Sequence, residues 1–482
     1  MSLPLTSPNT VLANALNQTV DLLRARIALK RPKRVDFIVG TQINGTPHLG
    51  TNLTQCAAFV LAREIRNAFS VDTTVTFNAL DNAPYHIELD PESFHSYQIT
   101  YRHALGLEAV TELTESLYLA FFEGLSERTA VDYRLQLYSE QQATPSFRQT
   151  FLKTLPLREQ LRWRVSPANG IMHVRFPCPH CFKAEKRGER MRILSTEKDC
   201  AIFEAFCFDH GVYQAIIKAE SDTYLDLSTL YRNVVKEAQI ADDQNVLGVM
   251  VKGGDWAFAC QLVDWALGVL GYKASELPVR WFTPQILTET GAKLSKSLIS
   301  RGEMEVPSQA FSWVLDTHDF EGDFEDYLDS LVGLVMGMLE DPKHFFRAYS
   351  YLEVDRLMKA QSPETRRENR ARLIRIYRKY FDLIASGKKT IEIRVGYSSM
   401  KKIKPGQLLR FVSQSESCLT RVIDVREYSS FEELFEKEDF TKINPDKGKA
   451  EQLADVRNIF SREKEALGVL AIEITREDEG VK

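Results

Sequence analysis

A buried strand that passes directly into a helix, near the start of the chain, most constrains what this sequence can fold into. Residues 35–40, VDFIVG, are apolar and rich in β-branched side chains, which predicts a strand, and residues 54–66, TQCAAFVLAREIR, carry apolar residues at helical spacing. Residues 73–81, TTVTFNALD, predict a second strand. A strand, a helix and a strand in this order form a β–α–β unit, which requires a parallel sheet covered by helices.

The turn between the first strand and its helix has the composition of an anion-binding site. It reads TPHLGTNL over residues 46–53. The first amide groups of a helix point outward without partners and attract anions, and Gly50 allows the backbone to approach a ligand closely. His48 can donate a hydrogen bond to a phosphate group. The alternative is an ordinary β–α turn with an exposed histidine.

Length and composition narrow the class of protein. A chain of 482 residues exceeds what one hydrophobic core holds, so we expect several domains. No apolar run approaches the roughly 20 residues of a membrane-spanning helix, and the first residues, MSLPLTSPNT, lack the basic-then-apolar plan of a secretion signal. Seven cysteines are an odd number, which disfavours a disulfide framework. We therefore expect a cytoplasmic protein with no membrane partner.

A second candidate for handling phosphate lies much later in the chain, in GAKLSKSLIS at residues 291–300. Lys293 and Lys296, with Ser295 and Ser297 beside them, form a compact cationic loop. Such a loop can close on a polyphosphate and neutralise the charge that develops during nucleotidyl transfer. The alternative is a solvated basic turn. The presence of the His48 turn in the other half of a split β–α–β domain favours the phosphate-binding interpretation.

Two pairs of metal-ligating residues follow the spacing of a zinc site. Cys178 and Cys181 stand three apart in CPHCF, and Cys207 and His210 stand three apart in CFDHG. Three thiolates and one imidazole suit a closed tetrahedral Zn²⁺ site, which leaves no position for water and is therefore structural. For the fourth ligand, Cys200 and His180 remain nearby alternatives to His210.

These motifs together resemble the class I aminoacyl-tRNA synthetases. HLGT at 48–51 is similar to their HIGH motif and KLSKS at 293–297 to their KMSKS motif, while VKGGDW at 251–256 stands where they carry a glycine-rich turn and an aspartate that faces the ribose. The region up to about residue 300 most resembles class I lysyl-tRNA synthetase. The shared features are TPHLGT, the zinc-like insertion, FRQTF and LREQLRW.

The resemblance implies attack of an amino-acid carboxylate on the α-phosphate of ATP, with Mg²⁺ sharing the neutralisation of charge and with lysine or an analogue as the amino acid. Trp256 stands where the lysyl branch normally has histidine, and Thr51 replaces the last histidine of HIGH. The implied catalytic residues are His48, Lys293 and Lys296, and the implied ATP-binding residues are Thr41, His48, Gly50, Thr51, Gly253, Gly254, Asp255, Ser295 and Ser297.

The C-terminal region resembles an ASCH domain, a small barrel related to PUA RNA-binding modules. SGKKTIEIRV at 386–395 carries the resemblance. Residues 366–410 hold fourteen Lys and Arg against three Asp and Glu, a patch that suits a phosphate backbone, and Tyr377, Tyr380 and Phe381 among them can stack on bases. A solvated basic helix is the alternative. The expected RNA-binding residues are Lys388, Lys389, Arg394 and Lys404.

The predicted fold class is α/β. A helix at 11–31 is expected before the first strand, and a basic helix at 360–381 before the ASCH-like domain. We expect a Rossmann-like catalytic domain with its first half at 1–92, a helical and zinc-binding insertion at 93–215, a second half at 216–300, a helical connector at 301–371 and an ASCH-like barrel at 372–482.

The expected function is ATP-dependent activation of an amino acid and its transfer to RNA, tRNA foremost, through the basic 366–410 region. One alternative is a synthetase paralogue that passes the adenylate to a small molecule, a peptide or a protein. Another is an inactive RNA-binding scaffold. The short connector leaves no room for the large helical anticodon-binding region of the lysyl enzymes, so we expect an anticodon to be read differently or not at all.

Overall fold

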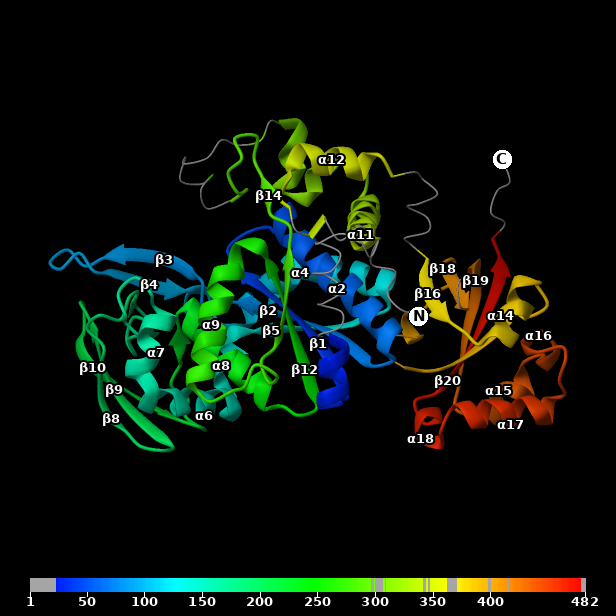
Figure 1. Ribbon diagram of the computed structural model, residues 1–482, viewed down its shortest axis with the longest axis horizontal. Helices are drawn as coiled ribbons and strands as arrows, with labels where there is room; N and C mark the ends of the chain where they lie inside the picture. Colours follow the sequence, from blue (N-terminus) through cyan, green and yellow to red (C-terminus); the bar gives the residue numbers. More distant parts are fainter. Residues whose placement is uncertain are drawn as a thin grey trace.

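The computed structural model arranges the chain as a central α/β body with further structure at each end of its long axis (Figure 1). The antiparallel strands of the predicted insertion lie at one end, and the C-terminal sheet lies at the other. No helix among the described residues is long and apolar enough to cross a membrane. The structure describes residues 23–295, 299, 307, 309–340, 344–345, 347–361, 371–397, 400–413 and 416–477.

Five parallel strands form the central sheet. Their order is β13–β12–β1–β2–β5, and β1 lies in the middle. The strand order therefore reverses between β1 and β12, and ligands of open parallel sheets bind beyond the carboxyl ends of the strands at such a reversal. The predicted α/β class with a parallel sheet is confirmed. The strands are β1 (Arg34–Gln42), β2 (Asp72–Leu80), β5 (Asp132–Leu137), β12 (Val246–Gly253) and β13 (Val279–Thr283).

Helices cover both faces of this sheet. Helix α2 (Leu49–Phe69) packs between the strands and two further helices, α4 (Leu107–Thr129) and α11 (Phe324–Glu340), and this layer holds the main apolar core. Helix α8 (Thr229–Asp242) lies on the opposite face, where Ile240 packs against Gly248 of β12. Helix α9 (Ala257–Val269) packs beside α8. Of the helix predicted at 11–31, residues 23–30 are helical, and the preceding residues lie outside the described part.

Strand β5 departs from the predicted division of the chain. The sequence placed the first half of the catalytic domain at 1–92 and an insertion at 93–215. The structure pairs β5 in parallel with β2, from Thr74 opposite Asp132 to Ala79 opposite Leu137, so the sheet draws a strand from inside the predicted insertion. The segment DYRLQL is an edge strand of mixed polarity. It therefore lacks the continuous apolar run that reveals a buried parallel strand.

The remainder of the insertion is built from short helices and antiparallel strands. A three-stranded sheet pairs β8 (Arg192–Thr196), β9 (Cys200–Cys207) and β10 (Gly211–Lys218), and β9 is the central strand. The other elements within the predicted bounds are β4 (Ser96–Thr100), α3 (Tyr101–Leu105), α5 (Tyr138–Ala143), α6 (Pro145–Thr154), η1 (Leu155–Leu157), α7 (Arg158–Val165), β6 (Val174–Arg175) and β7 (Ala184–Glu185). Two strands from outside those bounds pair with them, β3 (Pro84–Leu89) with β4 and β11 (Asp226–Leu227) with β6.

The connector folds back onto the central body. Its α11 packs on α2 and α4, and the short parallel pair β14 (Ile286–Leu287) and β15 (Tyr349–Ser350) joins it to the segment that follows β13. The predicted connector is therefore part of the main core. Its other elements are η3 (Gln309–Val314), η4 (Thr317–Asp319) and α12 (Tyr351–Lys359). The short helix η2 (Gly254–Trp256) lies earlier in the chain, between β12 and α9.

A buried ion pair ties the connector to the central body. Arg128 of α4 lies 2.7 Å from Asp329 of α11, with side chains 3% and 0% exposed. Because removing one partner leaves an uncompensated buried charge, we expect Asp329→Ala to lower the free energy of unfolding by about 3–5 kcal/mol. Glu325→Ala is the matched control, because Glu325 pairs with the same arginine from a half-exposed position and should cost less than about 1 kcal/mol. Equal losses in denaturant titrations would contradict this.

The C-terminal body is a curled five-stranded sheet in the order β16–β18–β19–β20–β17, with apolar clusters on both faces. The sequence predicted a basic helix at 360–381, but residues 372–375 form strand β16, with Arg372 buried, and residues 362–370 lie outside the described part. The elements are β16 (Arg372–Arg375), α14 (Arg378–Ala385), β17 (Ile391–Val395), η6 (Met400–Lys402), β18 (Leu408–Ser413), β19 (Glu416–Tyr428), α15 (Phe431–Lys437), α16 (Phe440–Ile443), α17 (Lys449–Ile459), α18 (Arg462–Glu465) and β20 (Val469–Arg476).

Candidate functional site

A cavity of about 280 Å³ opens beyond the carboxyl ends of β1 and β12, at the strand-order reversal. Residues from the first and the second half of the predicted catalytic domain line it together. Of the sequence-predicted site residues, the cavity lining includes Thr41, His48, Gly50, Thr51, Gly253, Asp255 and Lys293. Gly254 lies next to the lining, Ser295 follows on the same loop, and Lys296 and Ser297 lie outside the described residues.

His48 caps the N-terminus of α2 and is held by its own helix. Its Nδ1 accepts a hydrogen bond from the Gly50 amide at 3.1 Å, and its Nε2 lies 3.3 Å from the Thr51 hydroxyl. A Cβ atom at Gly50 would come within 3.1 Å of the His48 ring. Glycine at this position therefore leaves room for the imidazole at the mouth of the cavity, beside the amide groups of the first helical turn.

Lys293 reaches the same cavity from a tight hairpin. The backbone of Leu294 bonds to Ile286, Lys293 pairs with Leu287, and the turn passes through Gly291, whose φ of +82° favours glycine. The Lys293 ammonium donates to the Asp255 carboxylate. Asp255 in turn stands on η2, directly after β12. The two motifs that lie far apart in the sequence thus meet across one cavity.

The deeper part of this cavity contains residues that the sequence interpretation missed. Arg232, Asn233 and Lys236 of α8 line it, together with Asn78 of β2 and Lys252 of β12. Lys236 is 7% exposed and donates to the Asn78 side chain at 3.2 Å. A signal existed in the sequence, because positions 229, 232, 233 and 236 share one helix face and carry polar residues on a helix that is otherwise largely buried.

The four predicted zinc ligands lie together at the tips of two turns. The distance from Cys181 Sγ to Cys207 Sγ is 3.6 Å, and His210 Nδ1 lies 3.6 Å from Cys178 Sγ and 3.7 Å from Cys207 Sγ. All four ligand atoms fall within 4.8 Å of one another. A tetrahedral ion with Zn–S of about 2.3 Å and Zn–N of about 2.05 Å requires separations of roughly 3.6–3.8 Å, so the cluster fits Zn²⁺.

The four residues of this cluster come from two short turns of the chain. Cys178 and Cys181 belong to the turn between β6 and β7, while Cys207 ends β9 and His210 immediately precedes β10. The backbone of Cys178 bonds to Lys183 and Phe182, which closes the first turn around the two thiols. Among the described residues, Cys200 lies outside the cluster, and the His180 ring stands 5.1 Å from the His210 ring. The geometry therefore favours His210 as the fourth ligand.

The C-terminal sheet carries a second cavity, of about 410 Å³. Lys389 and Arg394 line it together with Tyr377, Tyr380 and Glu392. The Glu392 carboxylate forms ion pairs with both cations, at 3.3 Å from the Lys389 ammonium and 2.8 Å from the Arg394 guanidinium. The cavity therefore combines paired charges with two aromatic rings.

The four predicted RNA-binding residues do not form one exposed patch. Lys389 is only 4% exposed, because it donates to the Ile391 and Ile443 carbonyl groups in the interior, and burial lowers its pKa. Lys388 is exposed, and Lys404 lines a separate hollow that faces Glu127 and Glu325 of the central body. Of the predicted set, Arg394 alone is both half-buried and directed into the cavity.

Comparison with known proteins identifies the C-terminal part. Residues 374–477 match the ASCH domain family. The crystal structure of the hypothetical protein PH0355 is 34% identical, covering 22% of this chain and 97% of that protein, with a TM-score of 0.21. The solution structure of protein PF0455 from Pyrococcus furiosus is 32% identical, covering 22% and 98%, with a TM-score of 0.20. The chain therefore belongs to the ASCH-domain proteins through this segment, as the sequence predicted.

Two solved structures are distantly similar over a larger part of the chain. The glutamate-tRNA synthetase of Elizabethkingia anophelis is 11% identical over 73% of this chain and 72% of its own length, with a TM-score of 0.29. A Campylobacter jejuni protein described as an arginyl-tRNA synthetase is 9% identical over 71% and 88%, with a TM-score of 0.26. No curated protein matches the chain. Similarities at this level assign no activity, so the function has to be argued from the site.

Proposed function

We propose that this protein activates an amino acid with ATP, forming an aminoacyl-adenylate and pyrophosphate, and transfers the aminoacyl group to an RNA. One observation carries the proposal. His48, Asp255 and Lys293, from three separate segments, line a single cavity at the strand-order reversal of a parallel sheet. Nucleotides bind at this position in open α/β sheets, because helix N-termini and backbone amide groups converge there.

Each of these residues has a role that its position supports. The first turn of α2 and the His48 ring would hold the phosphates, and Lys293 would neutralise charge on the departing pyrophosphate. Asp255 would accept hydrogen bonds from the ribose hydroxyl groups once ATP draws Lys293 away. Mg²⁺ bound to the nucleotide would share the neutralisation of phosphate charge. No side chain has to act as a nucleophile, so positioning and electrostatics supply the catalysis.

The experiment that tests adenylation is amino-acid-dependent exchange of pyrophosphate into ATP, measured with each standard amino acid, with and without bulk tRNA. Exchange with any amino acid supports the proposal. Silence under all conditions, in a protein that still binds ATP, would contradict it and leave the scaffold interpretation.

The ASCH domain would hold the RNA. Its cavity is lined by Arg394, which would contact a phosphate, and by Tyr377 and Tyr380, whose rings would stack on bases. We expect Arg394→Ala to weaken binding of single-stranded RNA and to lower the slope of log affinity against log salt by about 0.7, the value of one phosphate contact. Arg462→Ala is the control, because Arg462 is exposed on α18 and outside the cavity lining. An unchanged slope, measured by fluorescence anisotropy, would place the RNA elsewhere.

A further inference from the structure

The deep half of the central cavity is positively charged. Arg232 and Lys236 lie one turn apart on α8 and are 5% and 7% exposed, and Lys252 of β12 lies beside them. Among the described residues of the cavity lining, Asp255 is the only acid, and it is paired with Lys293 at the outer end. Apart from Asp255, which is paired with Lys293, the described lining therefore offers these three inner cations no carboxylate.

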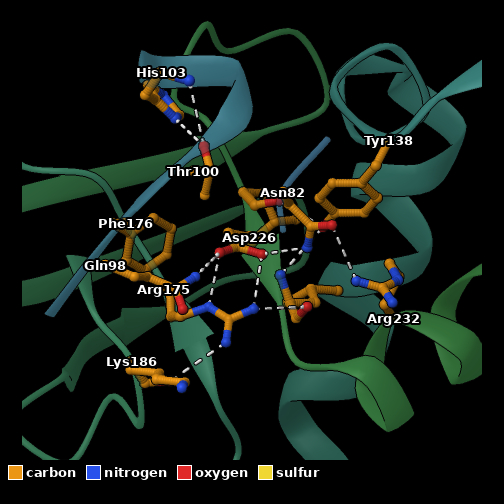
Figure 2. A network of polar contacts seen from close by, with 12 residues as sticks. Asn82, Gln98, Thr100, His103, Tyr138, Arg175, Phe176, Lys186, Asp226 and Arg232 are labelled. Atoms are coloured by element: carbon orange, nitrogen blue, oxygen red, sulfur yellow. Dashed lines mark hydrogen bonds and ion pairs between the residues drawn. The ribbon is translucent and has the colours of Figure 1, made fainter. Parts of the chain in front are cut away.

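The carboxylates behind this wall are already engaged. Asp226 receives both arms of the Arg175 guanidinium, at 2.7 and 2.9 Å, and the Asn82 amide at 2.7 Å (Figure 2). The side-chain oxygen of Asn82 in turn accepts a hydrogen bond from Arg232 at 3.3 Å. A neutral amide group therefore orients that arginine. Arg232 consequently has an amide rather than a carboxylate as its hydrogen-bonding neighbour.

The second buried acid next to the cavity is Glu237, which is fully buried. It lies 2.5 Å from Arg280 and 3.6 Å from Lys252, and Arg280 also pairs with Asp264. Three carboxylates, those of Asp226, Glu237 and Asp264, thus stand against five cations, namely Arg175, Arg232, Lys236, Lys252 and Arg280. The Lys252 ammonium has no hydrogen-bond partner within the described part of the chain and stands 4.9 Å from the centre of the Trp256 ring. The cluster therefore keeps an excess of positive charge.

This excess of buried positive charge is energetically unfavourable. Burial, together with repulsion from Lys252, Arg232 and Arg280 and against the opposing effect of Glu237, lowers the pKa of Lys236 to about 7. Cations that are buried without a counter-ion are unfavourable, and a bound anion relieves both the repulsion and the desolvation. A substrate ammonium group would instead meet like charges at close range.

We infer that the amino acid activated here has an anionic side chain, glutamate or aspartate, bound by Arg232 and Lys236 of α8. This inference rests on the proposed adenylation. The α-carboxylate has to lie at the outer end of the cavity, near His48 and Lys293, where the ATP phosphates would bind. The side chain then points inward to the three cations. The lysine specificity suggested by the sequence resemblance would need a carboxylate there, and the one acid of the described lining, Asp255, is paired with Lys293 at the outer end.

The test compares glutamate, aspartate, glutamine and lysine in pyrophosphate exchange. We expect kcat/KM for an acidic amino acid to exceed that for glutamine or lysine by roughly 10²–10³-fold, because a buried ion pair forms only with the acid. Lys236→Gln and Arg232→Gln should lower the value for the acid at least tenfold and leave that for glutamine almost unchanged. Lys236→Gln keeps a donor for Asn78 and so tests charge rather than folding. Lys153→Gln, a 67%-exposed lysine on α6, is the matched control.

The outcomes separate the inference from the function on which it rests. Exchange with lysine or a neutral amino acid, equal to or above that with the acids, overturns the inference and leaves adenylation standing. Silence with every amino acid refutes adenylation. The melting temperature of the full chain with and without glutamate or aspartate then tests the pocket alone: a stabilisation that Lys236→Gln abolishes supports the anion pocket, and no shift overturns it.

Discussion

Replacing Lys293 by alanine is expected to lower ATP–pyrophosphate exchange by roughly 10²–10³-fold, with little change in melting temperature. The side chain is 46% exposed and its described ion pair is with Asp255, so the fold does not depend on it. Its charge would be needed when pyrophosphate leaves, because the cavity otherwise presents cations mainly at its inner end. Loss of this charge therefore affects the transition state more than the folded state.

Two companion variants sharpen this experiment. Lys293→Arg should retain part of the rate because it preserves the charge on the same hairpin. Lys198→Ala removes an exposed lysine between β8 and β9 and should have no effect. An unchanged exchange rate in Lys293→Ala would remove this hairpin from the mechanism. The sequence resemblance predicts a loss of the same size for Lys296→Ala.

Replacing Cys207 by serine is expected to abolish stoichiometric zinc binding and to destabilise the insertion strongly. The purified parent chain should contain about one Zn²⁺, measured by atomic emission. Cys207 is fully buried, and its sulfur lies within 3.7 Å of both the Cys181 sulfur and the His210 ring. Structural zinc sites contribute about 10–16 kcal/mol of apparent binding free energy, so the loss should appear as a large fall in melting temperature.

The controls address the fourth ligand. Cys200→Ser and His180→Ala should keep zinc, since the cluster places His210 Nδ1 against Cys178 and Cys207. His210→Ala should release it. A folded parent chain that contains no metal, or zinc retained in His210→Ala and lost in His180→Ala, would contradict this assignment.

Features coded by neighbouring residues were accessible from the sequence. The predicted zinc ligands stand three apart on two turns, and His48 and Gly50 occupy one strand-to-helix turn. In both cases the chemistry depends on backbone geometry within a few residues. The ASCH domain was accessible for the same reason, through the turn and strand at 386–395. The expectation that the motifs at 48 and 293 would meet relied on the family resemblance, because nothing local connects them.

Features that depend on distant partners were not accessible. Strand β5 is polar enough to suit a helix or a loop, and its pairing with β2 makes it a strand. Segment 372–375 is basic like its neighbours, yet pairing with β18 turns it into a strand and buries Arg372. Lys389 was assigned to an exposed patch for its charge, and the carbonyl groups that it binds come partly from Ile443, far along the chain.

The local pattern of residues thus specified the α/β class, the cluster of three cysteines and one histidine, and the positions of the two phosphate-binding candidates, because each follows from spacing over a few residues. The positive charge of the central cavity came from the folded molecule. Arg232 and Lys236 are ordinary charged residues of a helix in the sequence. Packing of α8 on the sheet places them in one cavity beside Lys252, while Arg175 and Arg280 engage the acids behind it. Electrostatic balance depends on which distant charges become neighbours.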